Sequence, residues 1–260
     1  MKYNLHAHTY RCSHASGTAE EYVLRAIEGG IECFGFSDHM PYINPNGRED
    51  KFRVPVAEAD GYISEILSLK EKYKDKIDIH VGFETEYYAD HFDGMLEHAH
   101  SLGAEYLILG QHFWAPYSED RLPSSTPTSD VDRLDEYVSS VVSAIRSGAF
   151  TYVAHPDLFN FTGSDDEYAE YMRRICVASR ECGVPLEINF LGIREGRIYP
   201  SDRFFRIAAE ERSPITFGFD SHSVDAAYDA ESMAVAYDMV DRLSLNYIGM
   251  PKIVNISKRG

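Results

Sequence analysis

Eleven histidines in 260 residues are the feature of this sequence with the clearest chemical potential. His6 and His8 are separated by one residue, and Asp220 and His222 repeat this spacing far along the chain. On an extended chain, residues two apart point to the same face at about 6.6 Å, so each pair could hold one metal ion. Imidazole and carboxylate ligands together favour zinc, iron or manganese over magnesium or calcium. We therefore expect a transition-metal site.

Further candidate ligands follow other segments that are expected to be strands. The carboxyl ends of parallel strands form the active site of α/β barrels, so this agreement in position favours one shared site. A catalytic zinc ion needs about three protein ligands, so the full set indicates two or three divalent metal ions with a bridging carboxylate. Glu84 is the expected bridge, and Glu86 is expected to contact substrate or to support a ligand. The candidate ligands are His6, His8, His14, His39, Glu84, His112, His155, Asp220 and His222.

Strand-like and helix-like segments alternate along the whole chain. The expected strands are residues 2–5, 31–37, 77–83, 106–109, 150–154, 186–189 and 215–219. Thr18 and Glu21 predict a capping box at the first helix, and residues 131–145 carry apolar side chains at helical spacing. We expect one α/β domain over residues 1–260, a closed or nearly closed parallel barrel. An open doubly wound sheet is the alternative, although no GxGxxG motif follows the first strand.

The composition excludes several classes of protein. Lys and Arg number 25 against 42 Asp and Glu, and this net charge of −17 argues against a nucleic-acid or anionic-membrane partner. No apolar run approaches a membrane span, and four cysteines without a CxxC pair do not form a disulfide framework. We expect a cytoplasmic protein, with no indication of its oligomeric state. Cys12 and His80 are expected to be structural, and His91, His98 and His100 to be solvated or supporting residues.

The motifs taken together resemble the polymerase and histidinol phosphatase (PHP) superfamily. Residues 62–84 and 187–201 are similar to its histidinol-phosphatase branch. The resemblance implies a distorted (β/α)7 barrel with a trinuclear metal centre. The motifs that carry it are His6-Ala7-His8-Thr9, Ser37-Asp38-His39, Gly82-Phe83-Glu84, Gly110-Gln111-His112, Ala154-His155-Pro156 and Gly218-Phe219-Asp220-Ser221-His222.

The resemblance also implies roles for individual residues. It places His6, His8, Glu84 and Asp220 on one metal ion, Glu84, His112 and His155 on a second, and His14, His39 and His222 on a third. Arg194 matches a phosphate-binding arginine of the family, a role suited to the planar guanidinium group. Asn160 stands where the family tends to carry a second basic residue. Arg197, or Arg48, Lys51 or Arg53 from the long segment 40–55, could replace that charge.

The expected function is a metal-dependent phosphatase that hydrolyses a small phosphate monoester, with L-histidinol phosphate of histidine biosynthesis as the leading substrate. Glu84, His155 and Asp220 are the expected catalytic residues, and Asp220 is the candidate for proton handling. Another phosphomonoester, a nucleotide phosphodiester or a phosphotyrosine peptide is the first alternative. A non-catalytic metal-binding module is disfavoured because every ligand position is occupied. A glycoside hydrolase using Glu84 and Glu86 is disfavoured because two carboxylates on one strand cannot flank a bond from both sides.

Overall fold

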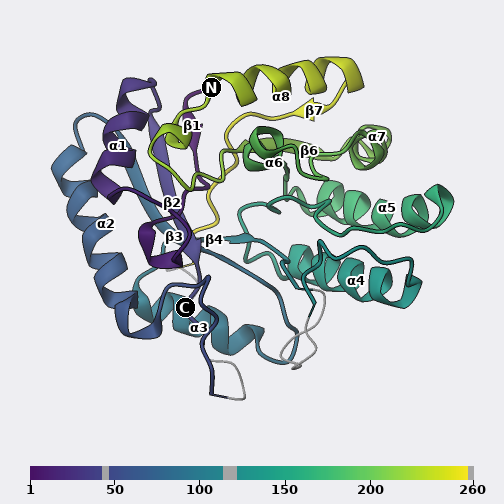
Figure 1. Ribbon diagram of the computed structural model, residues 1–260, viewed down its shortest axis with the longest axis horizontal. Coiled ribbons are helices and arrows are strands. Elements are labelled where there is room, and N and C mark those ends of the chain that lie inside the picture. The colour runs from purple at the N-terminus through teal and green to yellow at the C-terminus, as the bar shows by residue number, and fades with distance from the viewer. Residues whose placement is uncertain (43–46, 114–121, 257–260) are drawn as a thin grey trace.

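The structure is a computed structural model that describes residues 1–42, 47–113 and 122–256. Strands and helices alternate along the chain, as the sequence predicts (Figure 1). The strands are β1 (Tyr3–Asn4), β2 (Cys33–His39), β3 (Asp78–Thr85), β4 (Tyr106–Leu109), β5 (Leu186–Asn189), β6 (Pro214–Gly218) and β7 (Asn246–Tyr247). The helices are α1 (Ala19–Glu28), α2 (Ala59–Tyr73), α3 (Phe92–Leu102), α4 (Val131–Ser147), α5 (Asp165–Cys182), α6 (Phe190–Glu195), α7 (Asp202–Glu211) and α8 (Ala230–Leu243). Short 3-10 turns are η1 (Tyr10–Cys12), η2 (Val56–Glu58) and η3 (Asp225–Ala227).

The strands form a curled parallel sheet in two parts, ordered β1-β2-β3-β4 and β5-β6-β7. Single parallel bridges join the parts into a ring. Val153 bridges both Leu109 and Leu186 on one side, and Ala7 bridges Ser221 on the other. The expected α/β fold, a distorted (β/α)7 barrel, is therefore confirmed.

The observed strands differ from the expected ones in two respects. Residues 150–154 form no full strand, and Val153 alone bridges the neighbouring strands. Pro185 has no N–H to extend the ladder toward the amino end of β5, which keeps this pairing short. The chain also adds β7, which pairs with the start of β6 and which the sequence pattern does not predict.

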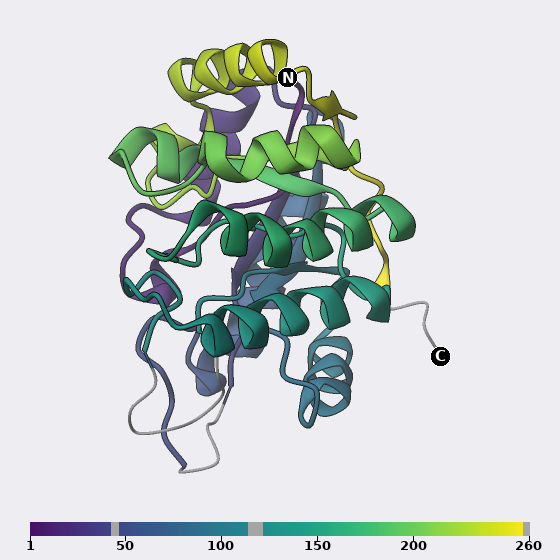
Figure 2. The same ribbon diagram turned by 90° about the vertical axis from the view of Figure 1, so that its right-hand side faces the viewer.

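The helices pack on the outside of the sheet through apolar faces. Helix α4 buries one stripe of its surface, including Leu134, Val138 and Ile145, as its periodicity predicts. It lies beside α5, and α5 lies beside α7, in the stack of helices in Figure 2. The capping box of Thr18 and Glu21 is present at the start of α1.

A second apolar cluster fills the inside of the ring below the carboxyl ends of the strands. It comprises Tyr3, Leu5, Cys33, Tyr106, Ile108, Tyr152 and Ala154. Glycines make room for it, since a Cβ added at Gly35 would lie 2.3 Å from the Tyr106 hydroxyl oxygen. One at Gly82 would lie 2.3 Å from the Tyr106 carbonyl oxygen. This packed floor leaves the carboxyl-end mouth of the barrel as the place for polar groups.

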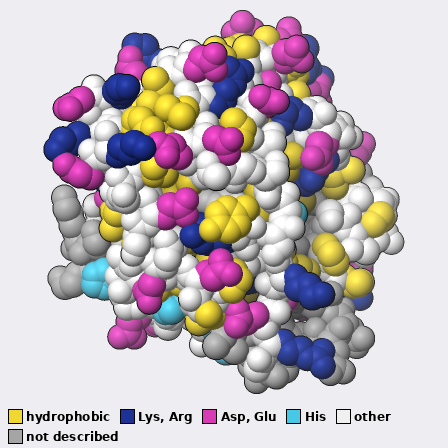
Figure 3. Space-filling view, turned by 60° about the vertical axis from the view of Figure 1, so that its left-hand side comes forward, with side chains coloured by type: hydrophobic (Ala, Val, Ile, Leu, Met, Phe, Trp, Pro, Cys, Tyr) yellow, Lys and Arg dark blue, Asp and Glu magenta, His cyan; other side chains and the backbone are white. Residues whose placement is uncertain are grey.

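The surface is mixed in charge. On the face drawn in Figure 3, acidic side chains lie among lysines and arginines. Among the described residues, no helix is long and apolar enough to cross a membrane.

Candidate metal centre

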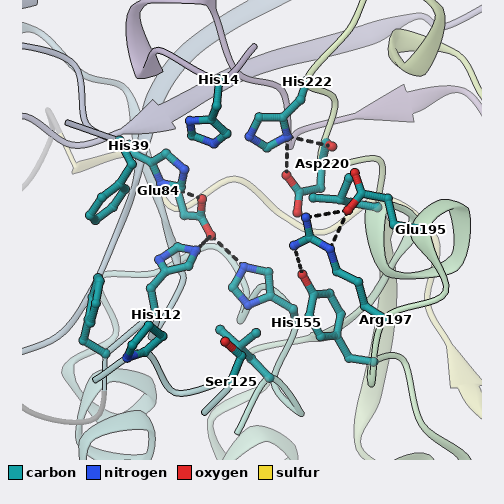
Figure 4. A pocket seen from close by; sticks show the side chains of 16 residues that line it. His14, His39, Glu84, His112, Ser125, His155, Glu195, Arg197, Asp220 and His222 are labelled. Atoms are coloured by element: carbon teal, nitrogen blue, oxygen red, sulfur yellow. Dashed lines mark hydrogen bonds and ion pairs between the residues drawn. The ribbon is translucent and has the colours of Figure 1, made fainter. Parts of the chain in front are cut away.

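All nine expected ligands meet at the carboxyl-end mouth of the barrel. A cavity of about 330 Å³ opens there, and His6 and His8 lie fully buried at its base. Figure 4 shows the candidates that line the cavity, which point toward one another from different parts of the chain. The ligand candidates that line the cavity itself are His14, His39, Glu84, His112, His155, Asp220 and His222.

Glu84 lies at the middle of this cluster, with its two carboxylate oxygens facing different imidazoles. Oε1 lies 2.9 Å from Nε2 of His155 and 3.4 Å from Nε2 of His112. Oε2 lies 3.4, 3.5 and 3.1 Å from ring nitrogens of His6, His8 and His39, respectively. A Cβ at Gly110 would come within 2.0 Å of Glu84 Oε1, so glycine at this position makes room for the carboxylate. This geometry is that of a carboxylate able to bridge two metal ions.

Asp220 provides a second acidic group on the opposite side of the cavity. Its Oδ1 lies 3.3 Å from Nε2 of His8 and 3.2 Å from Nδ1 of His222. Asp220 and His155 both have left-handed backbone, with φ of 47° and 30°. Such conformations cost about 1–3 kcal/mol each in residues other than glycine and cluster at functional sites.

A third group of ligand atoms lies nearer to the solvent. His14, His39 and His222 each offer a ring nitrogen, and these atoms lie within 4.8 Å of one another. The His14 and His222 rings are stacked with centroids 4.5 Å apart. His14 is the exposed member of the trio and follows η1 rather than a strand. The described geometry thus brings together the three residues that the resemblance assigns to a third ion.

Buried polar atoms without hydrogen bonds test whether metal ions fit this cluster. Among the described residues, Nε2 of His6, Nε2 of His8, Oε2 of Glu84 and Oδ1 of Asp220 are buried and make no hydrogen bond. Leaving a buried polar group unpaired costs about 1–3 kcal/mol, and more if it is charged. These four atoms face the same space, and cations placed there would satisfy them. The donor set therefore fits divalent transition metals.

The protonation states of Glu84, Asp220 and His39 suit ligands. Although burial raises them, nearby imidazoles hold the pKa values of Glu84 and Asp220 well below the ordinary carboxyl values. Burial, together with the neighbouring His8, lowers the pKa of His39 to about 3. Both carboxyl groups are therefore ionised and the His39 ring is neutral, the forms in which these groups bind metals. Burial lowers the pKa values of His6 and His8, but nearby carboxylates outweigh it and raise that of His6 well above its ordinary value and that of His8 to about 9. Metal binding must therefore displace protons from these two rings.

Carboxylates behind the ligands fix the orientation of their rings. Nδ1 of His6 lies 2.8 Å from Oε1 of Glu187, and Nδ1 of His8 lies 3.4 Å from Oδ1 of Asp38. Asp38 and Glu187 are not among the site residues expected from the sequence, although both lie at strand ends in phase with the ligands. A metal-binding imidazole usually donates the N–H of its other ring nitrogen to such a carboxylate. Their position on strands beside the ligands is therefore the signal that could have identified Asp38 and Glu187.

Glu86 belongs to this supporting set. Its Oε1 lies 3.3 Å from Nδ1 of His112 and its Oε2 accepts a 2.6 Å hydrogen bond from Arg53. Burial raises its pKa, but Arg53 and His112 outweigh this and lower it to about 2. Glu86 therefore lies behind His112, where it can support that ring.

The two candidate phosphate arginines lie in different places. Arg197 lines the cavity and donates to the Tyr199 hydroxyl at 2.8 Å, with Glu195 beside it (Figure 4). Arg194 instead donates to the carbonyl oxygens of Phe219 and Asp220 at 2.8 and 2.9 Å. The unexpected helix α6 begins directly after β5 and turns Arg194 toward the chain that carries Asp220.

Two of the remaining basic or polar candidates are engaged by other residues. Asn160 donates to the carbonyl oxygen of Ser125 at 3.1 Å, and Arg53 is engaged with Glu86. Residues 114–121 lie outside the described residues, as do residues 43–46 of segment 40–55. The apolar part of the cavity wall consists of Phe52, Phe113, Leu158 and Leu191.

Comparisons with known proteins agree with this arrangement. A protein of Deinococcus radiodurans named "Probable histidinol-phosphatase" is 28% identical over 231 residues, covering 84% of this chain and 85% of that protein. The histidinol-phosphatase of Bacillus subtilis is 28% identical over 265 residues, covering 86% and 96%.

Solved structures share the fold. A histidinol phosphate phosphatase from Lactococcus lactis, complexed with zinc, L-histidinol and phosphate, superposes with a TM-score of 0.70 at 19% identity. The match covers 99% of this chain and 98% of that chain. The PHP domain family matches residues 4–190. This range includes all of the candidate ligands except Asp220 and His222. The chain belongs to the PHP domain family.

Proposed function

We propose that this protein is a metal-dependent phosphatase that hydrolyses a small phosphate monoester, with L-histidinol phosphate as its substrate. The observation that carries the proposal is the position of Glu84 between two groups of imidazoles, at the base of a cavity that also holds Arg197. The histidinol-phosphatases among its relatives support the choice of substrate.

Two or three divalent ions of zinc, manganese or iron fit the cluster. His6, His8, Glu84 and Asp220 would hold one, Glu84, His112 and His155 a second, and His14, His39 and His222 a third. When bound, such ions act as Lewis acids on phosphoryl oxygens and lower the pKa of water to about 7.

The side chains of the protein supply the other requirements of the reaction. Arg197 presents N–H donors to the cavity, and a guanidinium group can hold two phosphate oxygens in a fixed orientation. Asp220 lines the same cavity and can orient the attacking water or accept its proton. The aromatic and aliphatic wall of Phe52, Phe113 and Leu191 excludes water from the organic part of the substrate.

The setting of the site agrees with a small substrate. A cavity of about 330 Å³ accommodates a small molecule rather than a polymer. The net charge of −17 disfavours a nucleic-acid partner. We also propose that residues 1–260 form one domain and that the protein acts in the cytoplasm.

A panel of phosphate esters tests the proposal. The purified protein, loaded with Mn²⁺ or Zn²⁺, is assayed with L-histidinol phosphate, sugar phosphates, phosphotyrosine and a nucleotide phosphodiester. We expect at least about a tenfold higher kcat/KM for L-histidinol phosphate than for the others. Turnover of another ester alone would reject the substrate, and absence of turnover on every ester would reject the phosphatase.

A further inference from the structure

The inward face of β3 carries polar residues at both of its ends. Side chains alternate along a strand, so Asp78, His80, Gly82 and Glu84 share one face. Glu84 lies at the carboxyl end, in the metal centre, whereas Asp78 and His80 lie at the amino end. Four residues of strand separate His80 from Glu84, or about 13 Å. The apolar floor around Tyr106 fills the space between the two ends.

Cys33 joins this second polar group from the neighbouring strand. Cys33 on β2 is the register partner of Asp78 on β3, so the two side chains lie next to each other. Cys33, Asp78 and His80 each offer one metal-ligating atom, and these atoms lie within 4.8 Å of one another. Nε2 of His80 lies 3.0 Å from Oδ2 of Asp78. Cys33 is buried and Asp78 is exposed, so the group lies where the barrel interior meets the solvent.

Glu105 holds the His80 ring from behind. Its Oε2 lies 3.0 Å from Nδ1 of His80 and also accepts the backbone N–H of Val81 at 3.2 Å. Its Oε1 accepts a 2.6 Å hydrogen bond from Lys70. The carboxylate is therefore fixed by groups other than His80. This arrangement repeats the one between Glu187 and His6 in the metal centre, and it directs Nε2 of His80 toward Asp78.

We propose that Cys33, Asp78 and His80 form a separate site for one transition-metal ion of the zinc type at the amino-end mouth of the barrel. Thiolate, imidazole and carboxylate are the three ligand types that zinc takes in proteins, and water completes the fourth position on the exposed side. Without metal, the doubly protonated His80 ring donates Nδ1–H to Glu105 and Nε2–H to Asp78. Binding displaces protons from His80 and Cys33, so it tightens as the pH rises.

Cobalt provides a test that separates this site from the metal centre. Co²⁺ bound by a thiolate absorbs in the near ultraviolet, whereas the nine ligands of the metal centre are imidazoles and carboxylates. The metal-free full-length protein is titrated with Co²⁺ near pH 8 and without Zn²⁺, because Zn²⁺ would compete for the proposed site. We expect a thiolate band that saturates at one thiolate-bound Co²⁺ per protein molecule and is lost in Cys33→Ser.

Control variants distinguish the alternatives. Cys176→Ser, at another buried cysteine, is expected to keep the band, and so is Cys12→Ser, although Cys12 lies within 4.8 Å of ligand atoms of His8 and His222. Since Cys33 is buried, His80→Gln and the exposed Asp78→Asn provide independent variants, each expected to weaken Co²⁺ binding at least about tenfold.

Two results would overturn the site. One is a wild-type protein without a thiolate band, and the other is a band that disappears in Cys12→Ser but persists in Cys33→Ser. Phosphatase activity plays no part in the readout, so the outcome is independent of the proposed function.

Discussion

The guanidinium group of Arg53 lies 2.6 Å from the carboxylate of Glu86, and both side chains are buried. Glu86 in turn lies 3.3 Å from Nδ1 of His112. A residue from the segment after β2 thus orients a ligand that follows β4. The ring of Phe52, next to Arg53 in the chain, lies edge-on to His39 at 5.2 Å. The position of this segment is therefore coupled to two ligands of the metal centre.

Replacing Arg53 tests this coupling. Arg53→Met leaves Glu86 buried without its cationic partner, and we expect metal affinity or kcat to fall about ten- to a hundredfold. Arg53→Lys keeps the charge and is expected to recover part of the loss. Metal titration and steady-state kinetics provide the measurements, with the exposed Lys252→Met as the control. Wild-type metal affinity and kcat in Arg53→Met would show that the ion pair does not support His112.

Glu84→Gln removes the bridging charge with little change in shape. The amide cannot offer two anionic oxygens to two ions, so we expect at least about a hundredfold loss of turnover and a lower metal content. Elemental analysis and kinetics measure the two effects, and circular dichroism checks the fold. Exposed Glu97→Gln is the control. A fully metallated, active Glu84→Gln protein would contradict the bridging role.

His155→Ala and Asp220→Asn address the two ligands with left-handed backbone. Each change removes a group that would stabilise charge in the transition state, and we expect at least about a hundredfold lower kcat in each variant while the barrel still folds. The assay uses excess Mn²⁺ or Zn²⁺, so that weaker binding alone does not explain the loss. Rates close to wild type under these conditions would reject both assignments.

Replacing each of the two arginines that follow β5 is expected to have a different effect. Arg197→Ala removes a donor from the cavity and should lower kcat/KM about ten- to a hundredfold at unchanged metal content, since a hydrogen bond to a charged group contributes about 1.5–3 kcal/mol. Arg194→Ala frees the carbonyl groups of Phe219 and Asp220 and should lower metal content as well. Parallel kinetics and elemental analysis separate the two. Equal metal content in both variants would refute the role of Arg194 in holding Asp220.

Removing metal should destabilise the folded protein. Ions present at about a hundred times their Kd stabilise a fold by about 2.7 kcal/mol per site, and 1 kcal/mol shifts Tm by about 2–4 °C at this chain length. We therefore expect chelation to lower Tm by at least about 5 °C, and Zn²⁺ or Mn²⁺ to restore it. Differential scanning calorimetry measures the shift. An unchanged Tm after complete metal removal, verified by elemental analysis, would contradict the structural contribution of the ions.

The sequence predicts the ligands better than the groups around them. His6, His8, Glu84 and Asp220 could be placed because each stands at the carboxyl end of a strand-like segment, and such segments alternate with helix-like ones along the chain. The position of Arg194 could not, because it depends on α6, a helix of one and a half turns with too few residues to show a helical period. The sequence does not decide between two roles for Glu86, because the direction of its side chain depends on Arg53, a residue distant in the chain.

The ring of the barrel closes where Ala7 meets Ser221, and the ligands His6, His8, Asp220 and His222 flank that seam. More than two hundred residues of chain separate the two sides of the closure. During synthesis, the chain must therefore be made as far as Asp220 before His6 and His8 can meet their partners across this seam. A truncated or nascent chain carries the amino-terminal ligands but not this pocket. Binding of metal ions at the carboxyl-end mouth of the barrel would thus distinguish chains in which this seam has closed from chains in which it has not.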